Sequence, residues 1–271
     1  MIEYSIREYA LSDIAAMKQL WCTVFEDSEE LVNSFFALLP DMGSAMVAEA
    51  EGKIVGAAYV LTGMELLGDG IVRPVCGYIY AVAVKPEYRG VGIGSALVKE
   101  AEQLGRRREA SVLCTLPAEE SLYAWYRDLL GFECVLHRKR HEVRSKASEP
   151  VMELSSTEYM MWREMMLSGK KHMHPSSPTL EFQRQFSRLL GGGLYSCASG
   201  ICEAHLDEGV CVINELICTF PEDRDAIAAS VAAALGAESA VYYLPSDCGE
   251  AYMAALPGTI PGDCIWNLSF D

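Results

Sequence analysis

Apolar residues alternate or recur at helical spacing along the first 144 residues of the chain. The segment IEYSIREY alternates as a strand does. The next segment, IAAMKQLWCTVF, has helical spacing and follows Ser12 and Asp13, either of which can cap a helix. A second short helix fits Glu29 to Leu39, and Pro40 is expected to end it.

Extended segments dominate the part that follows. AMVAEAEGKIVGAAYVLTGMELL is typical of a hairpin that turns at Glu51 and Gly52, and a third extended run covers Ile71 to Val84. After a helix that starts near Ile93, the pattern predicts the strand SVLCTL, the helix EESLYAWYRDLL and the strand GFECVLHRKRHEV. The expected order is strand, two helices, three strands, helix, strand, helix and strand.

A polar segment, SKASEP at 145–150, is the candidate linker because it is small and ends in proline. A helix is predicted from Ser156 to Leu167. The stretch SGKKHMHPSSP is interpreted as a loop with His172 and His174 at the surface, since two histidines without a third ligand do not indicate a metal site. No metal is therefore expected.

The remaining residues repeat part of the first pattern. Three strands are predicted with turns at Ser199-Gly200 and Glu208-Gly209, followed by the helix DRDAIAASVAAALG and the strand SAVYYLP. The sequence thus predicts an α/β fold with a mixed sheet and two domains, at 1–146 and 151–271.

The run YIYAVAVKPEYRGVGIGSALVKEAEQL indicates a strand, a glycine-rich loop and a helix. Arg89, Gly92 and Gly94 have the spacing R-x-x-G-x-G, with a further glycine at position 90. The first amides of a helix have no intrahelical acceptor and the helix dipole adds positive charge, so such a loop can bind a pyrophosphate. Glycines between a strand and a helix are also common in simple turns. The loop lacks G-x-x-x-x-G-K-[ST], which disfavours a nucleoside triphosphate.

This string resembles the coenzyme A loop of the GNAT acetyltransferases, and the order of elements in the first 144 residues is similar to that of the family. The resemblance implies a GNAT acyltransferase fold over 1–146 with acetyl-CoA (coenzyme A) as co-substrate. It also implies that the strand before the loop leaves its neighbour, often at a bulge, and pairs with the pantetheine arm. The cofactor-binding residues implied are Val82, Val84, Arg89, Gly90, Val91, Gly92, Ile93, Gly94 and Ser95.

The second half resembles a partial, degenerate GNAT-like domain. At the position of the loop it has TFPEDRD, with no glycine and three acidic residues, so it is not expected to bind a pyrophosphate. We expect this half to support the structure or to shape the substrate site.

Acyl transfer to an amine needs an unprotonated amine, a donor for the developing oxyanion and an acid for the departing thiolate. In the family the acid is the tyrosine of a Y-x-x-L-G-F segment, which YAWYRDLLGF resembles. Tyr126 is therefore the expected catalytic acid, although one residue more than usual separates it from Gly131, and Tyr123 is the alternative. No carboxylate lies between Arg73 and Val84, so no base is assigned.

Two further residues are candidates for a catalytic role. A nucleophilic Cys76 is disfavoured because its strand is predicted to be buried and no histidine is near it in sequence. The ending IWNLSFD resembles that of bacterial two-domain GNAT proteins, including the aminoglycoside acetyltransferases linked to enhanced intracellular survival, in which the C-terminal carboxylate reaches the active site. The resemblance implies a similar role for Asp271.

Composition narrows the class of protein. The 271 residues are 51% hydrophobic and 22% charged, as in a globular protein, and no apolar stretch reaches the length of a membrane span. The N-terminus carries charges where a signal peptide is apolar, and the ten cysteines form no C-x-x-C pair. A cytoplasmic protein with reduced thiols is therefore expected.

The formal net charge of −16 disfavours nucleic acid as a partner, because such a surface repels phosphates. It would favour a cationic substrate, or serve solubility alone. The sequence indicates no oligomeric state. Together these features predict an N-acetyltransferase that acts on a primary amine of a small molecule or an exposed amino group, by direct attack in a ternary complex. The alternative is a non-catalytic module that binds acyl-CoA or another protein.

Overall fold

The computed structural model describes residues 2–68, 70, 73–268 and 270. Its helices are α1 (Ile14–Phe25), α2 (Glu29–Met42), α3 (Ile93–Arg107), α4 (Glu120–Leu130), α5 (Ser156–Met166), α6 (Ser177–Leu189) and α7 (Arg224–Ala234). Its strands are β1 (Ser5–Glu8), β2 (Gly43–Ala50), β3 (Lys53–Leu67), β4 (Val75–Val84), β5 (Val112–Thr115), β6 (Glu133–Arg144), β7 (Met152–Glu153), β8 (His172–Pro175), β9 (Gly193–Cys197), β10 (Gly200–Asp207), β11 (Val210–Cys218), β12 (Ser239–Ser246) and β13 (Glu250–Ala255).

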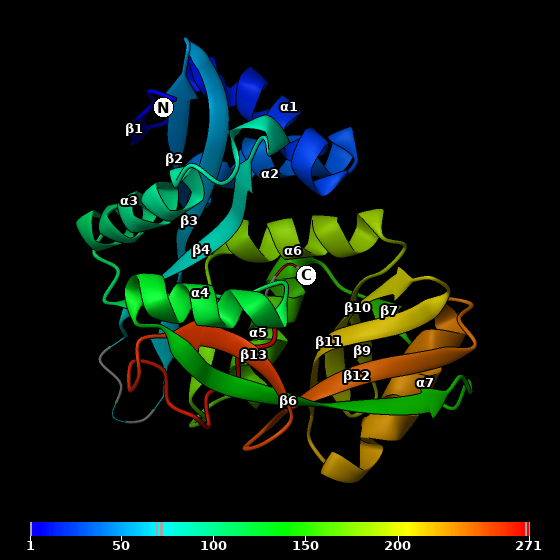
Figure 1. The fold of residues 1–271 in the computed structure, drawn as a ribbon. Helices are drawn as coiled ribbons and strands as arrows, with labels where there is room; N and C mark the ends of the chain where they lie inside the picture. Colours follow the sequence, from blue (N-terminus) through cyan, green and yellow to red (C-terminus); the bar gives the residue numbers. More distant parts are fainter. Residues whose placement is uncertain (1, 69, 71–72, 269, 271) are drawn as a thin grey trace.

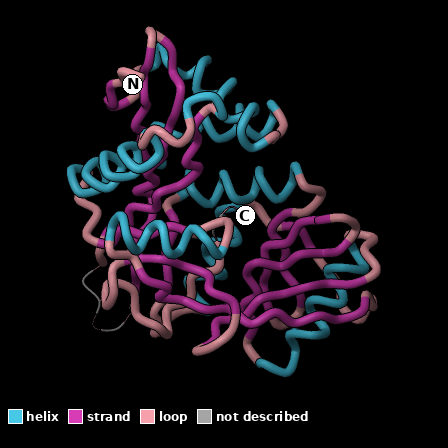
Figure 2. The backbone as a smooth tube through the Cα atoms, in the orientation of Figure 1, coloured by secondary structure: helices cyan, strands magenta, loops and turns pink. Residues whose placement is uncertain are grey.

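These strands form one mixed sheet that runs through both halves of the chain (Figure 2). The strand order is β1-β2-β3-β4-β5-β13-β6-β12-β11-β10-β9-β7, with β8 attached to β3. Strands β4 and β5 are parallel, as are β11 and β12, and the other described pairs of strands are antiparallel. The predicted α/β fold with a mixed sheet is therefore confirmed.

Helices cover both faces of the sheet (Figure 1). On one face, α1, α2, α5 and α6 pack their apolar side chains into a single cluster with the strands of the N-terminal half. Helices α3 and α4 lie on the opposite face, where Leu97 and Leu104 of α3 and Tyr126 of α4 are buried. Helix α7 packs on the C-terminal strands. Helices therefore cover strand β4 on both faces of the sheet.

The predicted order of elements in the first 144 residues is confirmed, including the turn at Glu51 and Gly52, both of which have a positive φ. Several element boundaries differ from the prediction, among them those at Pro40 and at the start of the third extended run. Pro40 lies inside α2, which continues to Met42, because a proline in the last turn removes only one helical hydrogen bond. The third extended run begins as a strand at Val75, and its predicted start at 71–72 lies outside the described residues.

The predicted loop SGKKHMHPSSP contains strand β8, and the helix that follows it, α6, was not predicted from the sequence. Strand β8 pairs with the distant end of β3, and His172 also forms a bridge with Ile265, so no local pattern marks it. His172 is buried rather than at the surface: its Nε2 lies 3.0 Å from Oε2 of Glu164. Nδ1 of His174 lies 2.9 Å from Oε1 of the same carboxylate. Although burial disfavours its charge, hydrogen bonds with these histidines hold the pKa of Glu164 well below its usual range.

The second half shows the predicted succession of three antiparallel strands, a helix and a parallel strand, as β9, β10, β11, α7 and β12. One strand at its end was not predicted. Strand β13 lies between β5 and β6, with Ala254 opposite both Thr115 and Cys134. The sheet of the N-terminal half is therefore joined by a strand of the C-terminal half, and residues 1–146 do not contain all of it.

A buried ion pair fastens α5 to the C-terminal strands. The guanidinium of Arg163 binds both carboxylate oxygens of Glu215 on β11, at 2.9 and 3.0 Å. The Tyr159 hydroxyl donates to the same carboxylate at 2.9 Å, and both charged side chains are at most 1% exposed. Because the pair is fully desolvated, losing one partner leaves an uncompensated charge in the interior.

The position of β13 predicts that a fragment of residues 1–146 does not fold as a stable monomer, because β5 and β6 lose the strand that joins them. Circular dichroism on heating should show no cooperative transition, while the full chain unfolds cooperatively. A monomeric fragment with a cooperative transition near that of the full chain would contradict this reading of the sheet.

The buried pair predicts that Arg163→Ala lowers the free energy of unfolding by about 3–5 kcal/mol in urea denaturation. The matched control is Arg184→Ala, which breaks a partly exposed pair with Glu181 on the surface of α6. That control should cost no more than about 1 kcal/mol. Equal losses of unfolding free energy in the two variants would show that the buried pair does not stabilise the fold more than the partly exposed pair.

Candidate functional site

Strands β4 and β5 part in the middle of the sheet. Their parallel register ends with the pair Tyr78 and Cys114, while β4 continues to Val84 and β5 ends at Thr115. Among the described residues, no further pair joins the two strands. The edge of β4 beyond Tyr78 that faces β5 is therefore open.

The open part of β4 contains a β-bulge. Tyr80 lies opposite Tyr59 and Ala83 opposite Ala57, so two residues of β4, Ala81 and Val82, face a single residue of β3. Ala81 has a φ of 48°, a left-handed conformation that is unusual for alanine. The bulge predicted from the family resemblance is thus present, and it changes the direction of the main chain at the open edge.

Main-chain groups of β4 are directed to this edge. The amide of Lys85 donates to the carbonyl oxygen of Val55 on β3 at 2.9 Å. Since main-chain groups of successive strand residues alternate between the two edges, those of Val84 and Val82 point away from β3. The carbonyl of Val84 accepts a hydrogen bond from Nε of Arg89 at 2.9 Å, which ties the loop to the strand.

The loop from Arg89 to Ser95 connects this strand to α3. Gly90 and Gly92 have φ values of 79° and 92°, a left-handed conformation that only glycine adopts readily. A Cβ atom at Gly90 would meet no heavy atom within 4 Å, and one at Gly92 would meet only the Tyr4 hydroxyl at 3.9 Å. The space above both glycines is therefore open to a ligand.

The amides of the loop point to an anion site. Ala96 is the first residue whose amide donates within the helix, to the carbonyl of Gly92 at 3.0 Å. The preceding amides of α3 have no intrahelical acceptor, and the helix dipole adds positive charge beside them. The side chain of Ile93 is buried in the core, so only its main chain faces the loop, whereas Val91 is 45% exposed. The loop residues predicted from the sequence thus lie together at one helix N-terminus.

Tyr126 lies on the α3 and α4 side of the parting strands. It is 5% exposed and packs with Ile79 of β4, Val98 of α3 and Phe132. Burial raises the pKa of Tyr126, while a hydrogen bond with the Thr115 hydroxyl acts in the opposite direction. The phenol is therefore protonated at neutral pH. Tyr123 is partly buried against the same cluster, so both tyrosines stay candidates.

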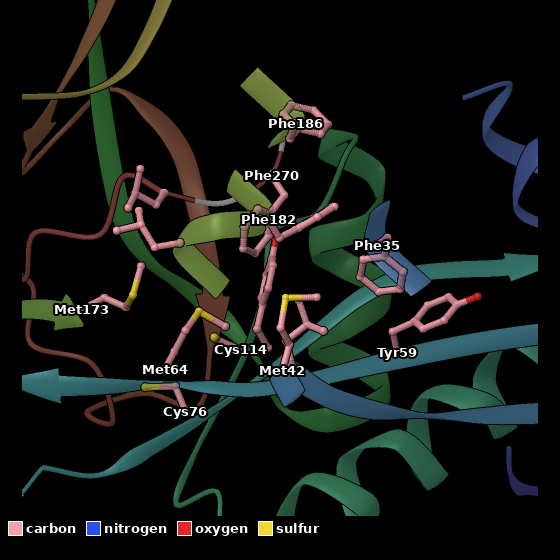
Figure 3. Packing of buried hydrophobic residues seen from close by; sticks show 14 of the residues in the cluster. Phe35, Met42, Tyr59, Met64, Cys76, Cys114, Met173, Phe182, Phe186 and Phe270 are labelled. Atoms are coloured by element: carbon pink, nitrogen blue, oxygen red, sulfur yellow. The ribbon is translucent and has the colours of Figure 1, made fainter. Parts of the chain in front are cut away.

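An aromatic cluster lies on the opposite face of β4. Tyr80 donates a hydrogen bond to the carbonyl oxygen of Phe270 at 3.3 Å, and their rings are 5.7 Å apart. Phe270 also packs on Phe182 of α6 at 5.1 Å (Figure 3). The ending IWNLSFD is the signal in the sequence for this contact, and Phe182 was not predicted because helix α6 was not predicted. Asp271 lies outside the described residues.

The described residues do not support a cysteine nucleophile, a metal site or a membrane-spanning helix. Cys76 is fully buried and its burial raises the pKa of the thiol, which makes it a poor nucleophile. No group of three or more His, Cys, Asp or Glu side chains in the described part of the chain is arranged to hold a metal ion. The described helices include none with both the length and the apolar character needed to cross a bilayer.

Residues 13–132 match the acetyltransferase (GNAT) family. An uncharacterised N-acetyltransferase of Methanocaldococcus jannaschii is 33% identical over 99 residues, which are 36% of this chain and 56% of that protein. The chain therefore matches little more than half the length of this relative.

Solved structures resemble almost the whole chain. A GCN5-related N-acetyltransferase from Kribbella flavida is 16% identical, with a TM-score of 0.69 over 94% of this chain and 71% of that one. One from Anabaena variabilis is 14% identical, with a TM-score of 0.67 over 93% and 72%. Eis1 from Mycobacterium abscessus is 12% identical, with a TM-score of 0.59 over 93% and 73%. At these identities the likeness concerns the fold, and it extends across both halves.

Proposed function

We propose that this chain, whose residues 13–132 match the acetyltransferase (GNAT) family, transfers an acetyl group from acetyl-CoA to a primary amine. The observation that carries the proposal is the glycine loop, which presents free helical amides next to the open edge of β4. An anion-binding loop beside unpaired strand groups suits a ligand with a diphosphate at one end and an amide-containing arm at the other.

In this proposal the coenzyme is held mainly by main-chain groups. The amides from Gly90 to Ser95 bind the diphosphate, and Arg89 adds positive charge and holds the loop on Val84. The main chain of Val82 at the open edge of β4 pairs with the pantetheine arm. Three observations support this fit: the open space above the glycines, the bulge, and the end of β5 at Thr115.

The transfer would occur in a ternary complex. The amine lone pair attacks the thioester carbon, the carbon–sulfur bond breaks, and the departing thiolate takes a proton from Tyr126. The attacking nitrogen then loses one proton, which restores the Tyr126 phenol and leaves the neutral amide. The ammonium proton of the acceptor must leave before attack, and the described residues of β4 and β5 contain no carboxylate to take it. A desolvating pocket or a base from another segment must therefore remove that proton.

The acceptor is a small-molecule amine or an exposed amino group. The net charge of −16 supports a cationic acceptor, since an acidic surface attracts one. The C-terminal residues support a role in shaping the acceptor side, because Phe270 packs on Tyr80 and Phe182 packs on Phe270. We retain the division into an acetyltransferase domain at 1–146 and a degenerate GNAT-like domain at 151–271, with β13 contributed to the first sheet by the second half.

Gly92→Glu should weaken acetyl-CoA binding by more than about tenfold in calorimetry, because a carboxylate at the helix N-terminus repels the diphosphate. Gly209→Glu is the matched control: this glycine also has a positive φ, 83°, and open space, but lies in the β10-β11 turn. Both variants carry the same added charge and similar backbone strain. Equal affinities of the two variants for acetyl-CoA would show that the loop is not part of the coenzyme site.

Tyr126→Phe should lower kcat about a hundredfold while acetyl-CoA affinity stays unchanged, because the ring still packs but no longer donates a proton. Release of coenzyme A from acetyl-CoA across a panel of amines measures this, with Tyr123→Phe made in parallel. Loss of activity only in Tyr123→Phe would assign the acid to that residue. Acetyl-CoA binding by the wild type without turnover on any amine would favour the non-catalytic module.

A further inference from the structure

A small cavity lies where the two halves of the chain meet, beside the strand β6 that runs between β13 and β12 (Figure 1). Its walls come from four strands and from the segment that follows β13, and they include His137, Arg138, Asn214, Tyr243, Tyr252 and Trp266. Among the described residues, no member of the glycine loop and no residue of β4 lines it. The cavity has a volume of about 10 Å³, which is room for about one water-sized group.

One buried donor at this cavity has no acceptor. Trp266 is 1% exposed, and its indole Nε1 makes no hydrogen bond with any described residue. The buried indole of Trp21, by contrast, donates to Oδ2 of Asp27 at 2.7 Å. An indole N–H can only donate, and a buried donor without an acceptor costs free energy. Because Trp266 lines the cavity, the missing acceptor is expected inside it.

A positive charge is held at the same cavity. The Arg138 guanidinium lies 4.0 Å from the centre of the Tyr243 ring and 4.7 Å from that of the Tyr252 ring. The carboxylate of Glu250 lies 3.5 Å from Nε of Arg138, but its side chain is 55% exposed, so water screens this pair. None of the described residues that line the cavity is acidic. A guanidinium also only donates, so a negatively charged acceptor suits these two donors best.

The size of the cavity is fixed by main-chain contacts. Nδ2 of Asn267 donates to the carbonyl oxygens of Asn214 at 3.0 Å and of Tyr243 at 3.4 Å. These bonds use both amide protons and tie the segment after β13 to β11 and β12. The same segment continues to Phe270, which packs on Tyr80 of β4. An occupant of the cavity therefore helps to hold the residues that reach β4.

We propose that this cavity binds a single chloride ion between the Arg138 guanidinium and the Trp266 indole. The volume admits a monatomic anion and leaves no room for a polyatomic one such as phosphate. The two donors and the absence of a lining acid select an anion. The ion is a structural ligand that joins strands of both halves, and it takes no part in the proposed acyl transfer. Since only the folded chain forms the cavity, chloride stabilises the fold by mass action.

Thermal unfolding of the full chain in sodium chloride and in sodium gluconate at equal ionic strength tests the site, because gluconate is too large for the cavity. With chloride about tenfold above its Kd, the wild type should unfold about 2–4 °C higher than in gluconate, and the shift should saturate. Trp266→Phe keeps a ring but removes the N–H, and Arg138→Gln removes the charge. Both variants should lose most of the shift.

Trp21→Phe is the matched control, because it also removes a buried indole but lies outside the cavity. General effects of the two salts act on all variants alike, so only the chloride site separates Trp266→Phe from Trp21→Phe. The control should keep the full shift of the wild type. A wild type without the shift, or a Trp266→Phe variant that retains it, would overturn the inference.

Bromide gives a direct test that needs no variant, since it scatters X-rays anomalously and replaces chloride. Crystals of the wild type soaked in sodium bromide should show an anomalous peak in the cavity, within contact of Nε1 of Trp266 and of the Arg138 guanidinium. A cavity that holds only a water molecule, with no anomalous peak, would refute the chloride site.

Discussion

The parting of β4 from β5 is the constraint on which the rest of the structure depends. Strands in the middle of a sheet normally satisfy their main-chain groups on both edges, and unpaired groups in an interior are costly. Here β5 stops at Thr115 while β4 continues through a bulge, so the strand offers hydrogen-bonding groups to a ligand without any polar side chain. The loop, α3 and α4 are arranged around that opening.

The first half was predictable because its signals are local. The glycine spacing after an alternating strand located the loop, and the positive φ values of Gly90 and Gly92 give the physical reason for those residues. The bulge was expected from the family resemblance, but its position at Ala81 was not visible in the sequence, since alanine does not mark a left-handed conformation.

The second half was less predictable because its contacts are distant. Strand β8 forms by pairing with β3 and by a bridge to Ile265, and β13 forms by pairing with β5 and β6. His172 and His174 were expected at the surface, yet both lie against Glu164, a partner on α5 that no spacing rule connects to them. Phe270 packs on Tyr80 of β4 and Phe182 packs on Phe270, although these two phenylalanines come from distant parts of the C-terminal half. The contacts of such residues can be recognised only when the order of the strands in the sheet is known.

The late position of β13 has a consequence for biosynthesis. The strand between β5 and β6 leaves the ribosome long after both of its neighbours. Until then two strand edges stay exposed in the nascent chain, and pairing across such a sequence separation is slow. A stop codon before Glu250 would therefore remove this strand from the sheet that carries the candidate site, and a chain that lacks β13 keeps the exposed strand edges that make such intermediates prone to aggregation.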